Sequence, residues 1–163
     1  MNDAIDSLAA ELGGRLLDAG LVLAAAESCT GGWIAKCVTD VAGSSAWFDR
    51  GFVTYSNAAK CDMLGVSVRT LEAQGAVSEA VVREMVSGAL TRSTAQVAVA
   101  VSGIAGPGGG STEKPIGTVC FGFALGGRVK TETLRFDGDR DGVRRQTVEH
   151  ALRRLIALLA DVR

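Results

Sequence analysis

The sequence predicts a three-layer α/β/α sandwich around a mixed, mostly parallel five-stranded sheet with an antiparallel edge hairpin. Two observations predict this fold. Short apolar runs without polar alternation, typical of strands buried on both faces, alternate with segments of helical periodicity. Two further strand-like runs flank Gly126-Gly127, a two-residue turn signal of a β-hairpin. The length suits one domain, and we expect residues 1–163 to form it.

In the first part of the chain, helical and strand-like segments alternate. Apolar residues recur every four positions before Gly20, which predicts a first helix. The elements expected after it depend on apolar runs and on glycine or capping signals at their ends. In order, they are a helix over 3–19, a strand over 21–26, a helix from Gly31-Gly32 to Val41, a strand over 52–55, and a helix from Asn57, its expected N-cap, to Leu64.

The second part of the chain ends in the hairpin and a long helix. An apolar stripe after Ser78, an expected N-cap, predicts a helix, and the almost wholly apolar run that follows predicts a third buried strand. Glycines and both prolines crowd the next segment, which predicts a loop. The expected elements are a helix over 78–90, strands over 96–101, 118–125 and 129–136, a loop over 102–117, and a terminal helix over 143–162.

The charge balance argues against non-specific nucleic-acid binding. The 17 Lys and Arg residues face 18 Asp and Glu residues, a net charge of −1, whereas binding to phosphates in general needs clustered basic charge. The longest apolar runs, 21–26 and 155–160, are far shorter than the ~20 residues that cross a bilayer. Because acidic Asp3 and Asp6 stand where a signal peptide would be basic, we expect a cytoplasmic protein without a membrane partner.

The four cysteines do not indicate a disulfide framework or a zinc site. Cys29, Cys37, Cys61 and Cys120 lack C-x-x-C spacing, and a chain of this length forms a core without disulfides. A structural zinc ion needs four Cys or His ligands at characteristic spacing, and the chain has one histidine. We therefore expect reduced thiols, no metal and no cofactor.

The scarcity of histidine limits the kinds of hydrolase that the sequence allows. A nucleophilic hydroxyl needs a base, usually a histidine, a carboxylate or a lysine of lowered pKa. The only histidine, His150, lies among arginines of the expected terminal helix, which disfavours a Ser-His-Asp triad. Arginine does not accept protons near neutral pH, so the base would come from one of four lysines.

Polar residues after the first strand form a candidate nucleophile turn. In open α/β sheets, ligands bind at the carboxyl ends of the strands, where Ser28 is expected. The alternative is that Ser28 or Thr30 merely caps the following helix. Free amides at that helix start would suit an oxyanion or a phosphate. Cys29 competes as nucleophile, although nothing in the sequence indicates a lowered thiol pKa.

Tyr55 and Lys60 share the sheet edge with Ser28 if the first two strands are neighbours. Tyr55 ends the expected second strand and Lys60 lies on the next helix. The ordinary alternative is a strand-end aromatic with a wet hydroxyl and a solvated lysine. Ser56 and Lys60 are four residues apart, which does not match the S-x-x-K motif of penicillin-binding enzymes.

The glycine-rich loop after the third strand is a candidate anion cradle. Consecutive amides in residues 102–110 can form such a nest, but the loop lacks the Gly-Lys-Ser/Thr ending of a P-loop, and Ser111 interrupts G-x-G-x-x-G. A flexible connection explains the loop equally well. Arg140, Arg144 and Arg145 would suit a phosphate, although a solvated basic face is the commoner explanation.

Five segments, in order along nearly the whole chain, resemble the CinA carboxy-terminal domain family, the nicotinamide mononucleotide amidohydrolases also called PncC. They are Ala26-Glu27-Ser28-Cys29-Thr30-Gly31-Gly32, Gly43-Ser44-Ser45 with Phe48, Tyr55-Ser56-Asn57 with Lys60, the run 102–109, and the run 114–119. One departure is Ser102, where threonine is common in the family; it keeps the hydroxyl. Many relatives carry a further amino-terminal domain, and we expect this chain to be the stand-alone form.

The resemblance implies hydrolysis of nicotinamide mononucleotide to nicotinate mononucleotide and ammonia, without a cofactor. By resemblance, Ser28 is the nucleophile, Lys60 its base, and Tyr55 the hydroxyl that passes or orients the proton. Backbone amides of Cys29, Thr30 and Gly31 would stabilise the oxyanion. The other residues implied near the substrate are Ser45, Ser102 and Gly103, with Arg140 or Arg145 meeting the phosphate.

Two other functional hypotheses stay open. The chain would be a non-catalytic nucleotide-binding regulatory module if the glycine loop binds phosphate without turnover, or an oligomerising scaffold if its motifs are only caps and turns. The resemblance also implies a homodimer. The small-molecule partner expected in the first two cases is a pyridine nucleotide.

Overall fold

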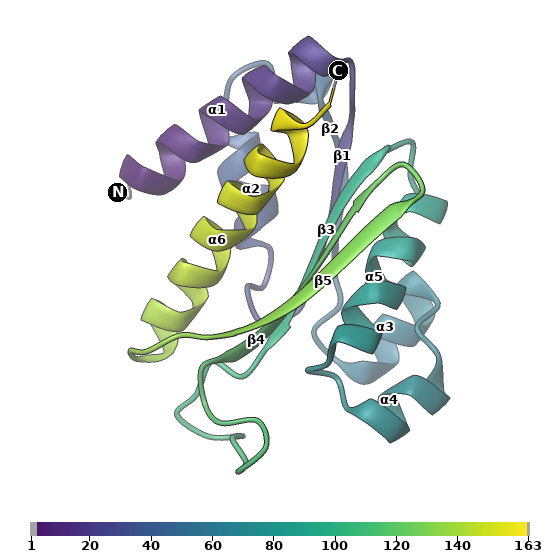
Figure 1. Ribbon diagram of the computed structural model, residues 1–163, viewed down its shortest axis with the longest axis vertical. Helices are drawn as coiled ribbons and strands as arrows, with labels where there is room; N and C mark the ends of the chain where they lie inside the picture. The colour runs from purple at the N-terminus through teal and green to yellow at the C-terminus, as the bar shows by residue number, and fades with distance from the viewer. Residues whose placement is uncertain (1–2, 163) are drawn as a thin grey trace.

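The computed structural model describes residues 3–162 and contains alternating helices and strands (Figure 1). The first half comprises α1 (Asp3–Ala19), β1 (Leu23–Glu27), α2 (Trp33–Thr39), the 3-10 helix η1 (Ser44–Ala46), β2 (Phe48–Val53), α3 (Asn57–Leu64) and α4 (Val68–Gln74). The second half comprises α5 (Glu79–Thr91), β3 (Val97–Gly103), β4 (Thr118–Leu125), β5 (Arg128–Arg135) and α6 (Arg140–Ala160).

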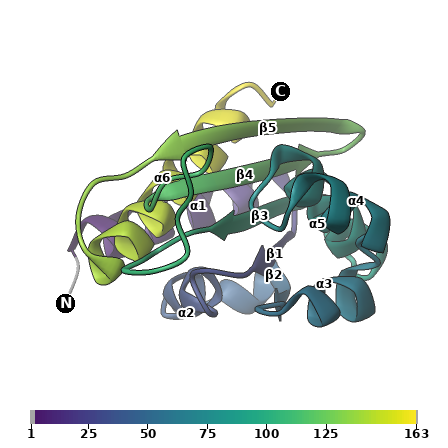
Figure 2. The same cartoon turned by 90° about the horizontal axis from the view of Figure 1, so that it is seen from below.

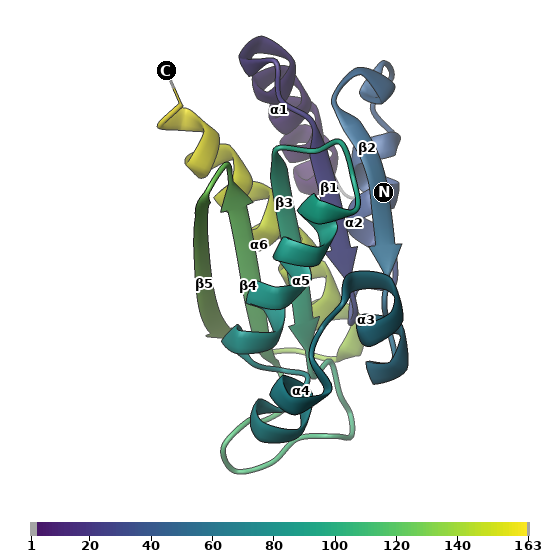
Figure 3. The ribbon, with the colours of Figure 1, turned by 90° about the vertical axis from the view of Figure 1, so that its right-hand side faces the viewer.

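The five strands form one mixed sheet in the order β2-β1-β3-β4-β5. β1 pairs in parallel with β2 and β3, while β4 runs antiparallel to both β3 and β5, so four strands share one direction. The turn between β4 and β5 is Gly126-Gly127, as the sequence predicts. Figure 3 shows the sheet with α5 across one face.

Helices cover both faces of the sheet, which confirms the three-layer sandwich. One core lies under α1, α2 and α6 and takes alternate residues of the central strands, among them Leu23, Val99 and Phe121. The other lies under α3, α4 and α5 and takes the residues between, such as Ala24 and Ala100. Both faces of β1 and β3 are therefore buried, which explains their continuous apolar sequences.

The carboxyl ends of β1, β2 and β3 meet at one end of the sheet, the lower end in Figure 1. The loop over 104–117 and the start of α6 also lie at this end. Figure 2, seen from below, shows the loop crossing near the start of α6. This clustering follows from the topology, because the loops that follow parallel strands all begin at the same end of the sheet.

Two expectations about the elements around the site were wrong, and one helix was missed. β2 covers 48–53 and not 52–55, because pairing with β1 extends it over Asp49, Arg50 and Gly51, whose strand propensities are low. Ser56, not Asn57, caps α3, and its side chain accepts from the Ala59 amide at 3.0 Å. The short helix α4 has no counterpart in the sequence analysis.

Replacing Gly88 by alanine is expected to destabilise the protein by about 3 kcal/mol. A Cβ at Gly88 on α5 would lie 2.0 Å from the Leu64 carbonyl oxygen at the end of α3, so the two helices would have to separate. Gly14→Ala is the matched control, since nothing lies within 4 Å of its Cβ on α1, and it is expected to stabilise by about 0.5–1 kcal/mol. Urea unfolding of both variants measures the difference, and equal midpoints would contradict this packing.

Candidate active site

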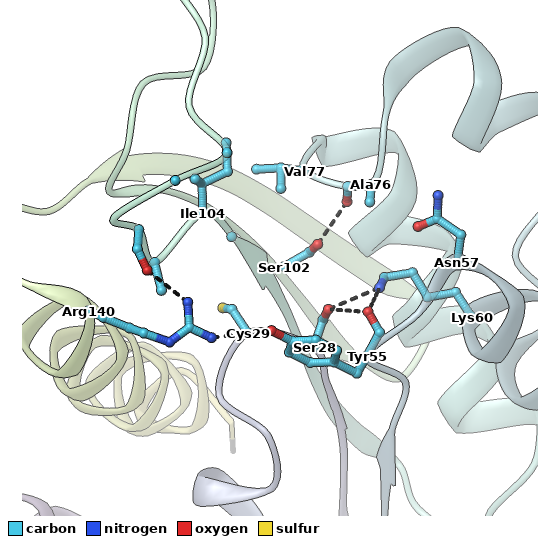
Figure 4. Close-up of a pocket in the computed structure, with 15 residues that line it drawn as sticks. Ser28, Cys29, Tyr55, Asn57, Lys60, Ala76, Val77, Ser102, Ile104 and Arg140 are labelled. Carbon is cyan, nitrogen blue, oxygen red and sulfur yellow. Dashed lines mark hydrogen bonds between the residues drawn. The ribbon is translucent and has the colours of Figure 1, made fainter.

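A cavity of about 300 Å³ opens where the three parallel strands end (Figure 4). Its volume is at the lower end of the range for small-molecule sites. The loops after β1 and β2, the glycine-rich loop after β3 and the first residue of α6 enclose it. The predicted site residues that line it are Ser28, Cys29, Tyr55, Lys60, Ser102, Gly103 and Arg140. This grouping depends on β1 and β2 being adjacent strands, and the structure confirms that they are.

A buried carboxylate, which the sequence analysis did not single out, shapes the turn that carries Ser28. Glu27 is fully buried at the end of β1, and its carboxylate accepts from the amides of Ile34 and Ala35, both at 2.9 Å, and from the Thr30 hydroxyl. Glu27 therefore satisfies the first amides of α2. Because neither Ser28 nor Thr30 has to cap the helix, the Ser28 hydroxyl is left to the cavity.

Lys60 and Ser28 form the polar centre of the site. The Lys60 side chain is 1% exposed, and its Nζ lies 2.9 Å from Ser28 Oγ. Nζ also donates to the main-chain carbonyls of Thr54 at 2.8 Å and Tyr55 at 3.3 Å. A neutral lysine has two N–H donors and one lone pair. When the two carbonyls take the donors, the lone pair remains for the Ser28 proton, which is the arrangement a general base needs.

Burial shifts the proton affinity of this lysine. Desolvation lowers the pKa of Lys60, because the low-dielectric site disfavours the ammonium form. No carboxylate is among the described residues that line the cavity to offset this effect. The lowered pKa makes the neutral amine, the form that a general base needs, easier to reach than it is for an exposed lysine.

The structure places the Tyr55 hydroxyl away from the serine and lysine. Tyr55 is 62% exposed, and its hydroxyl accepts from Arg140 Nη2 at 3.2 Å. Within residues 3–162, no hydrogen bond joins this hydroxyl to Ser28 or Lys60. The contact of Tyr55 with the pair runs through its backbone carbonyl instead. Its role in proton transfer therefore stays a prediction.

Cys29 lines the cavity, but its thiol is a poor nucleophile. Burial raises the pKa of the Cys29 thiol to about 12, so the reactive thiolate is scarce at neutral pH. The Gly31 amide, expected as an oxyanion donor, donates instead to the Ser28 carbonyl at 3.1 Å. In the described chain, the amides of Cys29 and Thr30 have no backbone acceptor. They remain the candidate donors of this turn.

The opposite wall of the cavity contains a second buried hydroxyl. Ser102 is 2% exposed and donates from Oγ to the Ala76 carbonyl at 2.8 Å, which leaves its lone pairs to accept from a ligand. Gly106, Gly108 and Gly109 also line the cavity, so the glycine loop takes part in the site. Asn57, missed as a site residue because its position indicated a cap, also lines the cavity and offers a carboxamide.

Arg140 is the predicted arginine that reaches the cavity. Its Nη1 donates to the Gly106 carbonyl at 2.8 Å, and in Figure 4 it lies across Ser28 from Lys60. Arg145 pairs with Asp141 at 3.0 Å and lies over the Trp33 ring, outside the cavity. The structure thus brings Arg140, and not Arg145, to the site.

Four other residues considered in the sequence analysis are not among the described residues that line the cavity. Ser45 lies in η1 before β2, whose first residue pairs with Leu23, so it is at the opposite end of the sheet from Ser28. Thr30 and Gly31 belong to the turn that carries Ser28, but they are not among the described residues that line the cavity. His150, which the sequence analysis had disfavoured as a base, is held by Glu132 at 2.6 Å between α6 and β5.

The described residues contain no metal-binding group of three or more His, Cys, Asp or Glu side chains. None of the helices in residues 3–162 is long and apolar enough to cross a membrane. All four cysteines are free.

A model of the CinA C-terminal domain matches residues 5–159. The chain belongs to the CinA C-terminal domain family. It is 60% identical to a protein named nicotinamide-nucleotide amidohydrolase PncC from Enterobacter agglomerans and 57% identical to one of the same name from Escherichia coli strain K12. These matches cover 91% of this chain and 91% and 90% of the two relatives.

A solved protein of similar sequence has the same fold. It is the competence/damage inducible protein CihA from Agrobacterium tumefaciens, which is 51% identical, with a TM-score of 0.93 over 97% of each chain. The resemblance seen in the sequence is thereby confirmed at the level of the CinA family.

Proposed function

We propose that the protein hydrolyses the carboxamide of nicotinamide mononucleotide to nicotinate mononucleotide and ammonia, with Ser28 as nucleophile and Lys60 as its base. The observation that carries this proposal is the 2.9 Å contact between Lys60 Nζ and Ser28 Oγ in a buried site. The names of the two amidohydrolase relatives support the substrate and the reaction class.

In the proposed first step, Lys60 takes the Ser28 proton as Oγ attacks the carboxamide carbon. The amides of Cys29 and Thr30 stabilise the oxyanion, and Lys60 returns the proton to the leaving nitrogen. Ammonia departs and an ester on Ser28 remains. Water then attacks this ester, again with Lys60 as base, which releases the carboxylate product and restores Ser28. The scheme needs no cofactor.

The substrate's phosphate is assigned to Arg140. The arginine is exposed, lies at the first residue of α6, and faces Ser28 across the cavity, so it can hold the far end of a nucleotide. Tyr55 lies between the two ends, where its hydroxyl orients Arg140. Ser102 and Gly103 are proposed to contact the nicotinamide end.

The test of this function is ammonia release from nicotinamide mononucleotide by the purified protein in the presence of a chelator. We expect multiple turnovers with the nucleotide and much slower release from nicotinamide, which lacks the phosphate. Calorimetric binding of the nucleotide without ammonia release would favour the non-catalytic regulatory module instead. No binding of any pyridine nucleotide would leave only the scaffold hypothesis.

Replacing Arg140 by glutamine is expected to raise KM for nicotinamide mononucleotide roughly 10- to 100-fold, the effect of losing one charge-assisted contact of about 1.5–3 kcal/mol. The effect on kcat should be smaller, because Arg140 lies away from Ser28. Arg145→Gln, on the same helix but outside the cavity, is the control. Equal KM values for the two variants would contradict the assignment of the phosphate subsite.

We also propose a cytoplasmic homodimer. Light scattering of the purified protein tests the assembly, and a monomeric mass would contradict it.

A further inference from the structure

Arg144 lies outside the cavity and forms hydrogen bonds with the turn that carries Ser28. From the first turns of α6, its Nε donates to the Cys29 carbonyl at 2.9 Å and its Nη2 to the Thr30 carbonyl at 3.2 Å. The guanidinium also lies 5.9 Å from the centre of the Trp33 ring, at the start of α2. Arg144 does not line the cavity, so these contacts do not belong to substrate binding.

The two carbonyls that Arg144 holds belong to the peptides that follow the nucleophile. A peptide unit is planar and trans, so its N–H points opposite to its C=O. Holding the Cys29 carbonyl toward α6 therefore turns the Thr30 N–H away from α6. The nearby positive charge also polarises this peptide and strengthens its amide as a donor. Thr30 is one of the two amides left without a backbone acceptor.

The buried Glu27 carboxylate also forms hydrogen bonds with this turn. It binds the Thr30 hydroxyl and the first amides of α2, whereas Arg144 binds main-chain carbonyls of the turn. The turn contains Gly31 and Gly32, both at positive φ, and glycine is the residue with the fewest backbone restrictions. A segment of this kind needs outside contacts to keep one conformation, and Glu27 and Arg144 supply them on two sides.

We infer that Arg144 is a positioning residue of the proposed reaction: its fork on the Cys29 and Thr30 carbonyls keeps Ser28 Oγ aligned with Lys60 and aims the amides of the turn at the oxyanion. This role rests on the proposed function of Ser28. Arg144 lies one helical turn after Arg140, so the same end of α6 holds both the phosphate subsite and the nucleophile turn.

The test compares three variants by the rate at which phenylmethanesulfonyl fluoride modifies Ser28, located by peptide mass spectrometry. In this reaction Oγ bonds to sulfur, fluoride leaves, and Lys60 takes the proton, so no nucleotide is needed. Arg144→Gln removes the charge and the fork, Arg144→Lys keeps the charge without the fork, and Arg145→Gln is the matched control. Thermal unfolding and kcat and KM for nicotinamide mononucleotide are measured in parallel.

We expect Arg144→Gln to slow both the modification of Ser28 and kcat about 10- to 100-fold, with KM within about threefold of wild type. Arg144→Lys should recover part of the loss, and Arg145→Gln should match the wild-type protein. Because the lysine variant keeps a cation beside Trp33, it serves as the folded comparison if the glutamine variant is unstable.

Wild-type modification rates in both Arg144 variants would overturn the inference, even with a lowered unfolding temperature, since Arg144 would then be merely structural. A change in KM alone would also overturn it. If wild-type Ser28 is modified but no ammonia is released from the nucleotide, the proposed substrate is wrong. The modification rates of the Arg144 variants then still test whether Arg144 positions Ser28. If the reagent leaves wild-type Ser28 unmodified, the inference fails together with the nucleophile.

Discussion

Replacing Ser28 by alanine is expected to lower kcat for ammonia release by about 10⁴-fold or more, because Ser28 carries the cavity hydroxyl that lies within hydrogen-bond distance of Lys60. Cys29 is not a substitute, since burial raises the pKa of its thiol to about 12. The measurement is ammonia release at saturating nicotinamide mononucleotide.

The Ser28→Ala protein should remain folded and still bind the nucleotide. Among the described residues, the hydroxyl forms hydrogen bonds only with Lys60 and the Tyr55 carbonyl, and alanine keeps the rest of the side chain. Calorimetry should give a Kd close to the wild-type value. Turnover at more than a tenth of the wild-type rate in this variant would contradict the assigned nucleophile.

Replacing Lys60 by methionine is expected to lower kcat about 10³-fold or more, because the change removes the base and keeps the apolar stem. The buried carbonyls of Thr54 and Tyr55 lose a donor, which should also cost about 1–3 kcal/mol of stability. Lys36→Met is the matched control, since Lys36 is exposed and pairs with Asp40. Activity is therefore measured well below the unfolding temperature.

The same lysine should give the wild-type enzyme a rising pH profile. The base acts in its neutral form, so kcat/KM increases as pH rises through the Lys60 pKa. Desolvation lowers that pKa, which places the midpoint below the ordinary lysine value of about 10.4. This limb should vanish in Lys60→Met. A flat wild-type profile between pH 6 and about 10 would show that Lys60 does not titrate as the base.

The order of elements could be predicted from the sequence because β1 and β3 are buried on both faces and are therefore almost continuously apolar. The edge strand β2 has a weaker sequence signal. Its exposed residues, such as Arg50, adopt strand conformation because they pair with β1, although their strand propensity is low. Gly126-Gly127 marked the hairpin because a two-residue turn has few suitable sequences.

The chemistry of the site was only partly readable. Ser28 and Lys60 are 32 residues apart, and their 2.9 Å contact depends on the pairing of β1 with β2. The role of Glu27 was hidden, because a carboxylate in a strand carries no signal of the amides it will meet.

Helical phase separates the three arginines of α6. Arg140 and Arg144 lie four residues apart and so share one side of the helix, while Arg145 is turned about 100° away from Arg144. The sequence analysis expected the helix to begin near Val143, after Arg140. It therefore could not predict which of these arginines faces the cavity. The position of Ser45 could not be read for a related reason, since sequence order does not tell which end of a sheet a loop occupies.

The central claim is that Ser28 and Lys60 act as one unit, and a double-mutant cycle tests it most directly. Rates of ammonia release are measured for Ser28→Ala, Lys60→Met and the double variant. If the lysine acts only by activating the serine, the double variant should be no slower than Ser28→Ala alone. Losses that multiply, with the double variant slower by the product of the two single effects, would show that the residues act independently and would contradict the account.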